Sequence, residues 1–424
     1  MSEQLICGID IGSSKVATIV ALQTPETQEM RIIGFNTTPS RGVKKGLIVD
    51  IDHVTTSVEE SVEKAERMAG HHIKEAFVSV GGPHISSINS HGIVAVANPQ
   101  FEVIEEDVNR VIEAARAISL SNTKHIIEVT PRQYSVDGQG GINNPIGMSG
   151  VRLEVDTHII TASATNLKNI DKVLGDLGIT NVGYIFSGLA SAESVLTDTE
   201  KDLGVALVDI GGGKIDMCIF VEGSLSYSSS IPIGARHISN DLAVGLRVSL
   251  ESAEKIKLYL SDHKKMVEEA IKKKEKHFLT ASRLDIVETL SEISPKEVIE
   301  GILGPRIEEI YSYVNDEIEK SGFEKNIPSG IVITGGGSLT IGMVEMGRRI
   351  TRLPVRIGIP ERASGLVDEI SNPMYAATLG LIYYGSSHIL QSDASFKDFN
   401  NILKNFTMGD IMSRVKKFIK QFLP

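Results

Sequence analysis

The sequence predicts an α/β protein made of two related domains that face each other across a ligand-binding cleft. The first observation is a repeat: residues 9–22 read IDIGSSKVATIVAL and residues 208–221 read VDIGGGKIDMCIFV. The second is a strand-like run that enters consecutive glycines in the segment 330–338, GIVITGGGS. Each copy of the repeat has apolar runs on both sides of a short Gly- or Ser-rich turn, which is typical of a β-hairpin. Two matching hairpins indicate a duplicated domain.

The composition is that of a large globular protein. The chain has 424 residues, of which 41% are hydrophobic and 23% are charged. At about 150 residues per domain, this length predicts roughly two to four domains. The net charge of −11 disfavours nonspecific binding of nucleic acid, because an acidic surface repels phosphates.

The cysteines and the N-terminal segment limit the possible compartments. Cys7 and Cys218 lie in apolar, strand-like runs, so we expect buried thiols in a reducing compartment and neither a disulfide framework nor a zinc site. Residues 1–15 carry Glu3 and Asp10 and lack the basic and apolar regions of a signal peptide. No run reaches the ~18 apolar residues of a spanning helix, so any membrane contact is expected from the cytoplasmic side without crossing.

The turns of the two hairpins suit an anion. Small residues let backbone amides approach an anion closely. One such turn is more often purely structural, but two copies predict facing hairpins that clamp a polyphosphate. The glycine turn in 330–338 is expected to join a strand to a helix and so to bring amides near a ligand, although taken alone it is more often only a turn. The aligned pairs are Asp10 with Asp209, Gly12 with Gly211 and Lys15 with Lys214.

The order of these motifs resembles the actin, Hsp70 and sugar-kinase superfamily over about residues 5–388. An Asp-x-Gly-Ser-Ser-Lys hairpin comes first, an Asp-x-Gly-Gly-Gly hairpin follows in mid-chain, and a Thr-Gly-Gly-Gly-Ser turn comes later. The resemblance implies an actin-like (ribonuclease H-like) fold with ATP and Mg²⁺ in the cleft. In that superfamily the two hairpins hold the phosphates and the third turn holds the adenosine.

The resemblance also implies roles for individual residues. Asp10 and Asp209 are expected to hold Mg²⁺ through water, since this ion prefers one or two carboxylates plus phosphate oxygens. Glu254 and Lys257 lie three residues apart on a helical pattern and share a face; the family places such a pair at the ribose and adenine, whereas the spacing alone also fits a surface ion pair. The implied nucleotide-binding residues are Asp10, Gly12, Ser13, Ser14, Lys15, Asp209, Gly211, Gly212, Gly213, Lys214, Glu254, Lys257, Gly335, Gly336, Gly337 and Ser338.

Two positions depart from the superfamily pattern. Lys214 stands where many relatives have Thr, so it either adds charge to the phosphate site or points to solvent. Ser187 stands where active ATPases have Glu or Gln, with Glu193 following on the same expected helix. Serine is a poor residue for orienting an attacking water, and no catalytic residue is assigned. We therefore expect ATP binding with hydrolysis slower than about 1 per second, a common enzyme rate.

Further segments resemble the FtsA family within this superfamily. They are SRGVKKGLIVDID at 40–52 and AFVSVGGPHI at 76–85. A later segment, NPMYAATLGLIYYG at 372–385, resembles the closing helix of the superfamily, which returns the chain to the first domain. In FtsA an insert after the second segment forms a domain that contacts neighbouring subunits and other division proteins. A second, helical and charged insert receives the acidic C-terminal peptide of FtsZ. Here Arg283 and Arg306 are the candidate partner residues, and the lysine run 272–274 is most simply a solvated helix face.

The resemblance divides the chain into six parts. The first actin-like subdomain comprises 1–83, 160–196 and 369–389, and the inserted interaction subdomain 84–159. The second actin-like subdomain comprises 197–233 and 303–368, and the helical subdomain with adenosine and partner contacts 234–302. A linker follows at 390–406, and a membrane-binding helix at 407–424.

The last segment has the pattern of a membrane anchor. Its apolar residues recur at spacings of one, three and four, and its basic residues fall mainly on the other face. A basic amphipathic helix after a polar linker favours an interfacial anchor, the alternative being a helix docked on the protein's own core. The anchor residues are Ile411, Met412, Arg414, Val415, Lys417, Phe418, Ile419, Phe422 and Leu423.

Taken together, the resemblance implies an ATP-binding cell-division protein. It would polymerise on the cytoplasmic face of the membrane at the septum, tether FtsZ filaments there and recruit later division proteins. A pilus-assembly adaptor of the same fold is an alternative, but it lacks the terminal helix. A small-molecule kinase would need a carboxylate base that is not evident, and an Hsp70-type chaperone would need a β-rich domain after the cleft.

Overall fold

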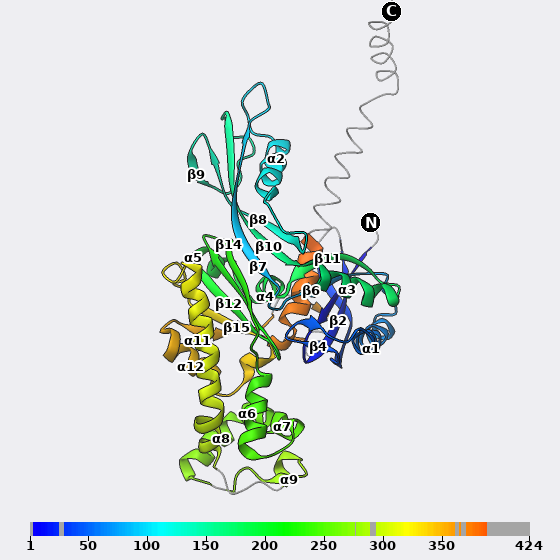
Figure 1. The fold of residues 1–424 in the computed structure, drawn as a ribbon, viewed down its shortest axis with the longest axis vertical. Helices are drawn as coiled ribbons and strands as arrows, with labels where there is room; N and C mark the ends of the chain where they lie inside the picture. The colour runs from blue at the N-terminus through cyan, green and yellow to red at the C-terminus, as the bar shows by residue number, and fades with distance from the viewer. Residues whose placement is uncertain are drawn as a thin grey trace, which may run out of the picture.

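The computed structural model describes residues 3–24, 29–275, 277–288, 294–360, 364–365 and 370–387. Two separate sheets form the centres of two lobes, which lie next to each other in Figure 1. The sheet of the first lobe has the order β11-β6-β1-β2-β3-β17 and that of the second β14-β13-β12-β15-β16. The strands of the first are β1 (Gln4–Ile11), β2 (Lys15–Gln23), β3 (Met30–Pro39), β6 (Glu75–Val80), β11 (Thr180–Phe186) and β17 (Ser364–Gly365). Those of the second are β12 (Val205–Ile210), β13 (Ile215–Val221), β14 (Ser224–Ile231), β15 (Ile331–Thr334) and β16 (Val355–Ile357).

The two sheets share one topology. In each, three consecutive antiparallel strands are followed by two that add in parallel on the other side of the first strand. The first hairpin closes in the same register in both lobes, with Ile11 opposite Val16 and Ile210 opposite Ile215. The prediction of a duplicated α/β domain is therefore confirmed.

The first lobe packs helices on its sheet. Helix α1 (Ile51–Ala69) begins where Asp50 accepts a hydrogen bond from the amide of His53 at 3.1 Å and ends at Gly70, whose φ is 69°. Its buried residues recur at helical spacing and pack against β2 and β3, because an amphipathic helix buries one face. The other elements are β4 (Val43–Lys44), β5 (Leu47–Ile48), α3 (Ala164–Asp176), α4 (Ser187–Val195), η3 (Pro373–Tyr375) and the helical residues 376–387.

An inserted domain leaves the first lobe after β6 and returns at α3. Its sheet has the order β7-β10-β8-β9 and is separate from the other two sheets. Helix α2 packs on β7 and β10 and shares a small core with residues such as Val111 and Leu153. Figure 1 shows this domain at one end of the molecule, extending away from the two lobes. Its elements are β7 (Ser86–Ala95), α2 (Glu105–Arg116), β8 (Lys124–Val136), β9 (Gln139–Ile142) and β10 (Arg152–Ser163).

The second lobe carries a helical subdomain between β14 and β15. Figure 1 shows the helices between residues 236 and 284 at the opposite end from the inserted domain. The lysine run 272–274 is exposed, as expected for a solvated helix end. The helices between β14 and β15 are α6 (Arg236–Leu246), α7 (Leu250–Asp262), α8 (Lys264–Lys273), α9 (Ala281–Leu284), α10 (Pro295–Val298), the π-helical η1 (Ile299–Leu303) and α11 (Gly304–Ser321). The second lobe also contains α5 (Asp198–Leu203), the 3₁₀ turn η2 (Gly336–Leu339) and α12 (Met343–Thr351).

Two further predictions concern cysteines and membrane spans. Cys7 and Cys218 are both free and buried, and burial raises the pKa of each thiol. Within the described ranges, no helix has the length and apolar character needed to span a membrane.

Candidate functional site

The turns of the two repeated hairpins have the same geometry. The amide of Gly12 donates to the carbonyl of Lys15 at 3.0 Å, and the amide of Gly211 donates to the carbonyl of Lys214, also at 3.0 Å. A Cβ on Gly12 would lie 2.8 Å from the carbonyl oxygen of Lys15. Glycine is therefore required for the turn to close this tightly in the first hairpin.

The two turns face and touch each other across the lobes. A Cβ on Gly212 would lie 1.9 Å from Oγ of Ser14, and one on Gly213 would lie 2.8 Å from Oγ of Ser13. In the part of the chain that the structure describes, no protein group accepts a hydrogen bond from the backbone amides of Ser13, Ser14, Gly212 and Gly213. Several unpaired amides in consecutive turn residues form a concavity that binds anions. The two turns that the internal repeat pairs in the sequence therefore meet in space.

Two carboxylates lie at the base of these turns. Asp10 accepts a hydrogen bond from Oγ of Ser79 at 2.5 Å, and Asp209 accepts one from Oγ of Ser191 at 2.5 Å. Burial raises the pKa of Asp209 to about 7, and the negative charges of Asp216 and Asp10 act in the same direction. A nearby cation would favour its ionised form.

These two carboxylates fit Mg²⁺ better than a metal held by protein ligands alone. The described residues contain no group of three or more His, Cys, Asp or Glu side chains arranged for a metal ion. Mg²⁺ usually takes one or two carboxylates and completes its shell with water and phosphate oxygens. The two carboxylates of Asp10 and Asp209, beside two turns with unpaired amides, match that requirement.

Lys15 extends from the first turn toward the segment before the closing helix. Its Nζ donates to the carbonyl of Met374 at 2.6 Å and lies 3.7 Å from the ring centroid of Tyr375. Burial lowers the pKa of Lys15 to about 8, while Asp10 and Asp209 oppose this shift. The ammonium is thus held near the predicted metal ligands and is partly desolvated.

The third glycine turn packs against the second hairpin. Gly335 has a φ of 78°, and a Cβ on it would lie 2.2 Å from Oδ1 of Asp209. A Cβ on Gly337 would lie 2.5 Å from Cγ2 of Ile210. The sequence predicted a helix directly after this turn, but the structure has the 3₁₀ turn η2, closed by Ser338 Oγ donating to the carbonyl of Gly335 at 2.7 Å.

Glu254 and Lys257 share one face of α7, as their spacing predicts. Nζ of Lys257 donates to Oε2 of Glu254 at 2.8 Å and to Oγ of Ser239, on α6, at 3.1 Å. Lys257 is 6% exposed, whereas the side chain of Glu254 is 43% exposed, so the lysine is buried and the carboxylate lies at the surface. The amide of Ile341, just after η2, donates to Oγ of Ser261 on α7 at 3.1 Å, which holds α7 beside the third turn.

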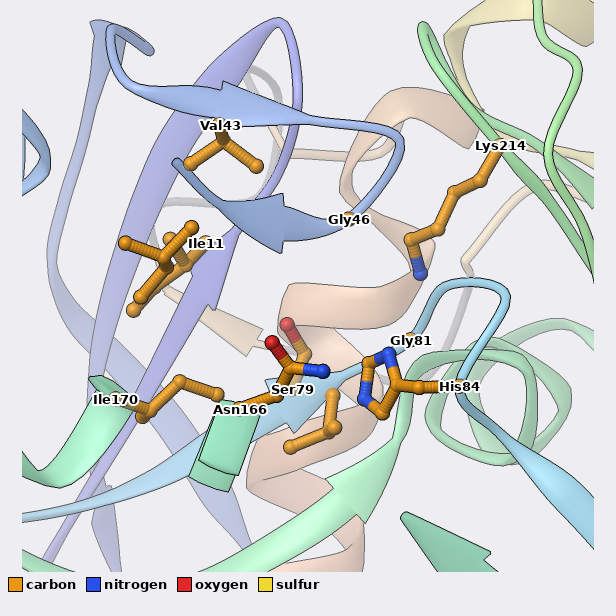
Figure 2. A pocket seen from close by; sticks show the side chains of 11 residues that line it. Ile11, Val43, Gly46, Ser79, Gly81, His84, Asn166, Ile170 and Lys214 are labelled. Atoms are coloured by element: carbon orange, nitrogen blue, oxygen red, sulfur yellow. The ribbon is translucent and has the colours of Figure 1, made fainter. Parts of the chain in front are cut away.

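Lys214 follows neither of the two sequence expectations. Its ammonium pairs with the carboxylate of Asp216 and donates to Oγ of Ser187 at 2.5 Å. It therefore points neither to solvent nor to the facing turns, because a buried carboxylate two residues along the chain attracts it. Figure 2 shows Lys214 reaching toward Gly81 and His84 at the edge of a small pocket of about 20 Å³.

Sequence reasoning missed several residues of this site. Asp216 is 2% exposed and lies opposite Asp209 in the hairpin register; a carboxylate inside the apolar run IDMCIFV was the available signal. Ser79 and Ser191 carried no signal, because many serines are structural. No described residue makes a hydrogen bond to either of the two buried ring nitrogens of His84, and burial lowers the pKa of His84 to about 4.

A groove on the helical subdomain contains one of the two predicted partner residues. Its volume is about 430 Å³. Nε of Arg306 donates to Oδ2 of Asp241 at 2.6 Å, and the same guanidinium contacts Glu309. Arg283 is on α9, donates to the carbonyl of Phe278 at 2.9 Å and does not line the groove. The lining residues are Asp241, Val244, Gly245, Gly301, Ile302, Pro305, Arg306 and Glu309.

The predicted linker and membrane helix, 390–424, lie outside the described residues. The nine predicted anchor residues therefore remain a sequence prediction.

Sequence comparisons match most of the chain. A family described as "SHS2 domain inserted in FTSA" matches residues 82–161, and one described as "Cell division protein FtsA" matches residues 206–380. The chain is 39% identical over 389 residues to the cell division protein FtsA of Pseudomonas aeruginosa, covering 91% of this chain and 90% of the relative. It is 34% identical to that of Borreliella burgdorferi over 428 residues, covering 100% of both chains.

Solved structures match the fold at low sequence identity. A PilM-PilN type IV pilus biogenesis complex has a TM-score of 0.62 at 14% identity, covering 90% of this chain and 98% of the other. MreB5 of Spiroplasma citri bound to ADP has a TM-score of 0.52 at 12% identity, covering 92% and 98%. At these identities the likeness concerns the fold alone, and it confirms the actin-like fold that the sequence predicted.

Proposed function

The chain belongs to the FtsA family of actin-like cell-division proteins, and from this premise we propose that it binds Mg²⁺-ATP between its lobes and uses the nucleotide to control assembly on a membrane. The observation that carries the proposal is the contact between two turns whose amides donate to no acceptor among the described residues. These turns belong to different lobes, so a ligand that binds both favours the closed arrangement.

The phosphates are bound by backbone amides and one ammonium. Ser13 and Ser14 donate from the first turn, and Gly212 and Gly213 donate from the second. The adjacent Lys15 adds a positive charge, and its partial burial strengthens the attraction because screening by water is weaker there. Asp10 and Asp209 hold Mg²⁺, which offsets the negative charge of the phosphates and of the carboxylates.

The adenosine is bound where the helical subdomain meets the third glycine turn. Glu254 and Lys257 are held in one orientation by their mutual contact and by Ser239. Gly335 to Ser338 approach the base of the second hairpin closely enough that larger residues would not fit at Gly335 and Gly337. Side chains held in place before binding reduce the entropy lost when a ligand binds.

Hydrolysis is slow because Ser187, which stands where active ATPases of the superfamily have Glu or Gln, is engaged in hydrogen bonds within the protein. The hydroxyl of Ser187 donates to Asp216 at 2.6 Å and accepts from Lys214. A hydroxyl that is committed in this way is a weak base, and general-base catalysis needs a group with a suitable pKa within hydrogen-bond reach. Nucleotide therefore acts mainly as a ligand that selects a conformation.

Assembly links the nucleotide site to the membrane. Each basic residue of the tail near an anionic leaflet contributes about 1 kcal/mol, and the apolar face adds burial. A single tail binds reversibly, whereas a polymer binds firmly because many tails act together. The inserted domain supplies contacts between subunits and to later division proteins, on the cytoplasmic face of the membrane at the division septum.

The FtsZ C-terminal peptide binds at the groove that contains Arg306. The groove is open and combines apolar residues, such as the 80% exposed Val244, with a cation. Arg306 is already paired with Asp241 and lies against Glu309. An acidic peptide must compete with both carboxylates, so we expect weak, salt-sensitive binding.

Co-flotation with anionic liposomes tests this function. The full chain and a chain ending at Asn405 are compared with and without Mg²⁺-ATP. We expect only the full chain to float and ATP to strengthen it, while the shortened chain still binds a fluorescent ATP analogue. Equal flotation of both chains would refute the anchor, and absence of nucleotide binding in both would refute the cleft assignment. No specific observation favours a pilus adaptor or a kinase.

A further inference from the structure

We propose that Lys214 is a latch that holds the two lobes closed, independently of bound nucleotide, and that this latch slows nucleotide exchange. The part of the inference that concerns exchange rests on the proposed nucleotide site. The latch itself rests only on contacts between the lobes, which extend beyond the facing turns.

The side chain of Lys214 enters a hole in the first lobe. A Cβ on Gly81 would lie 1.9 Å from its Nζ, and a Cβ on Gly46 would lie 2.9 Å from its Cδ. Gly46 and Gly81 come from the β4–β5 turn and from the end of β6, so two separate segments leave room for one lysine. Figure 2 shows the side chain crossing from its own hairpin to these glycines.

Hydrogen bonds around the ammonium join the same two lobes. Ser187, at the start of α4, donates to Asp216 of β13 at 2.6 Å and accepts from Lys214 at 2.5 Å. The amide of Gly82 in the first lobe donates to Oγ of Ser230 at 3.0 Å, and Ser230 in turn donates to Asp216 at 2.6 Å. Asp216 is thus the centre of a polar network to which both lobes contribute.

Opening the lobes would break this network at three points. The Lys214–Ser187, Ser187–Asp216 and Gly82–Ser230 hydrogen bonds all cross the boundary. Lys214 and Asp216 are both in the second lobe and would stay paired. Their side chains are only 14% and 3% exposed in the closed arrangement, and buried charges depend on every hydrogen bond that compensates for their lost hydration. The latch therefore favours closure without any ligand.

Lys214 acts on nucleotide through lobe position rather than by contact. Nucleotide bound between facing turns leaves only when the turns separate. Each hydrogen bond to a charged group that must break first slows that separation. Loss of the ammonium is therefore expected to raise the nucleotide release rate about tenfold, the effect of one charge-assisted hydrogen bond.

The test measures the distance between the lobes in the full chain by pulsed electron paramagnetic resonance. Spin labels are attached at Lys64→Cys on α1 and Asp316→Cys on α11, both exposed positions. The native Cys7 and Cys218 are buried and are not expected to react with the label. Distances are recorded without nucleotide and with Mg²⁺-AMPPNP, and release of a fluorescent ATP analogue is followed separately.

Lys214→Met keeps the length of the side chain and removes the charge. We expect the short distance to predominate in the parent without nucleotide and to become still more populated with Mg²⁺-AMPPNP. Lys214→Met should shift the population without nucleotide toward a longer distance, and Mg²⁺-AMPPNP should reverse that shift. Ser187→Ala, a milder change that leaves the Lys214–Asp216 pair intact, should shift the distance in the same direction. Lys255→Met is the matched control, because Lys255 makes an exposed pair with Asp285 away from the lobe boundary.

The outcomes separate the latch from the nucleotide site. A parent in which the longer distance predominates without nucleotide, or variants whose distances match the parent, would overturn the latch even if ATP binds normally. Opening of both latch variants, with no change in the control, supports it even if no nucleotide binds. Circular dichroism of each variant verifies that it is folded before the distances are compared.

Discussion

Gly212→Ala would place a methyl group between the two facing turns, 1.9 Å from Oγ and 3.0 Å from Cβ of Ser14. Ser14 is exposed, so its hydroxyl can rotate away, but its Cβ cannot. The turns must then separate by a few tenths of an ångström. We expect a cost of about 1 kcal/mol, at the lower end for overpacking, and a fall of roughly 2–4 °C in the Tm of a unit of 150–250 residues.

A double-mutant cycle with Ser14→Gly isolates this contact. Ser14→Gly removes both atoms that meet the new methyl group, so Gly212→Ala should cost far less in that background. Residues in contact typically couple by about 0.5–3 kcal/mol, whereas distant residues add. Tm is measured for the parent, both single variants and the double variant by differential scanning calorimetry without nucleotide. Strict additivity would show that the turns do not touch, and the nucleotide site built on their contact would fail with them.

Two other predictions rest on burial and close packing, and a third rests on the sequence of the C-terminal tail. Gly380→Ala should destabilise the protein by about 1–3 kcal/mol, because the new Cβ would lie 1.7 Å from the carbonyl oxygen of Ala190. Gly336→Ala is the matched control, since its Cβ would lie 3.7 Å from its nearest neighbour. Equal melting temperatures of the two variants would contradict this packing. The pKa of Asp209 is raised by burial to about 7 from 3.8, so the folded protein binds a proton that the unfolded chain has lost. The parent's stability relative to Asp209→Asn should therefore fall as the pH rises from about 4 to about 7, and parallel Tm profiles would refute the shift. Phe418→Glu should release the protein from anionic liposomes without lowering its Tm, whereas a large fall in Tm would favour a helix docked on the core.

Local sequence was sufficient for the parts of the site that depend on the backbone. The Asp-x-Gly pattern, repeated at Asp10 and Asp209, identified two hairpins, because glycines indicate a tight turn and the apolar runs on both sides of it indicate strands. The same pattern predicted that the hairpins form equivalent parts of duplicated sheets, and the shared strand order confirms it. The spacing of Glu254 and Lys257 placed them on one helical face.

The sequence alone could not predict which side chains of one lobe contact residues of the other lobe. Lys214 was expected near phosphate or in solvent, yet it pairs with Asp216 and reaches Ser187 of the other lobe. No local pattern encodes this contact, because it depends on the relative position of segments from both lobes. The same holds for Lys15, which donates to a carbonyl in the segment before the closing helix.

The sequence by itself determined the duplicated fold, the family and the turns that suit phosphate, because periodicity and glycine placement act over a few residues. The tertiary structure decided how those turns meet, which serines hold Asp10 and Asp209, and where the ammonium of Lys214 lies. The physical reason is that burial and the partners of a charged group are set by distant segments. Those quantities govern the pKa of Asp209 and the closure of the lobes, and they exist only once the chain is folded.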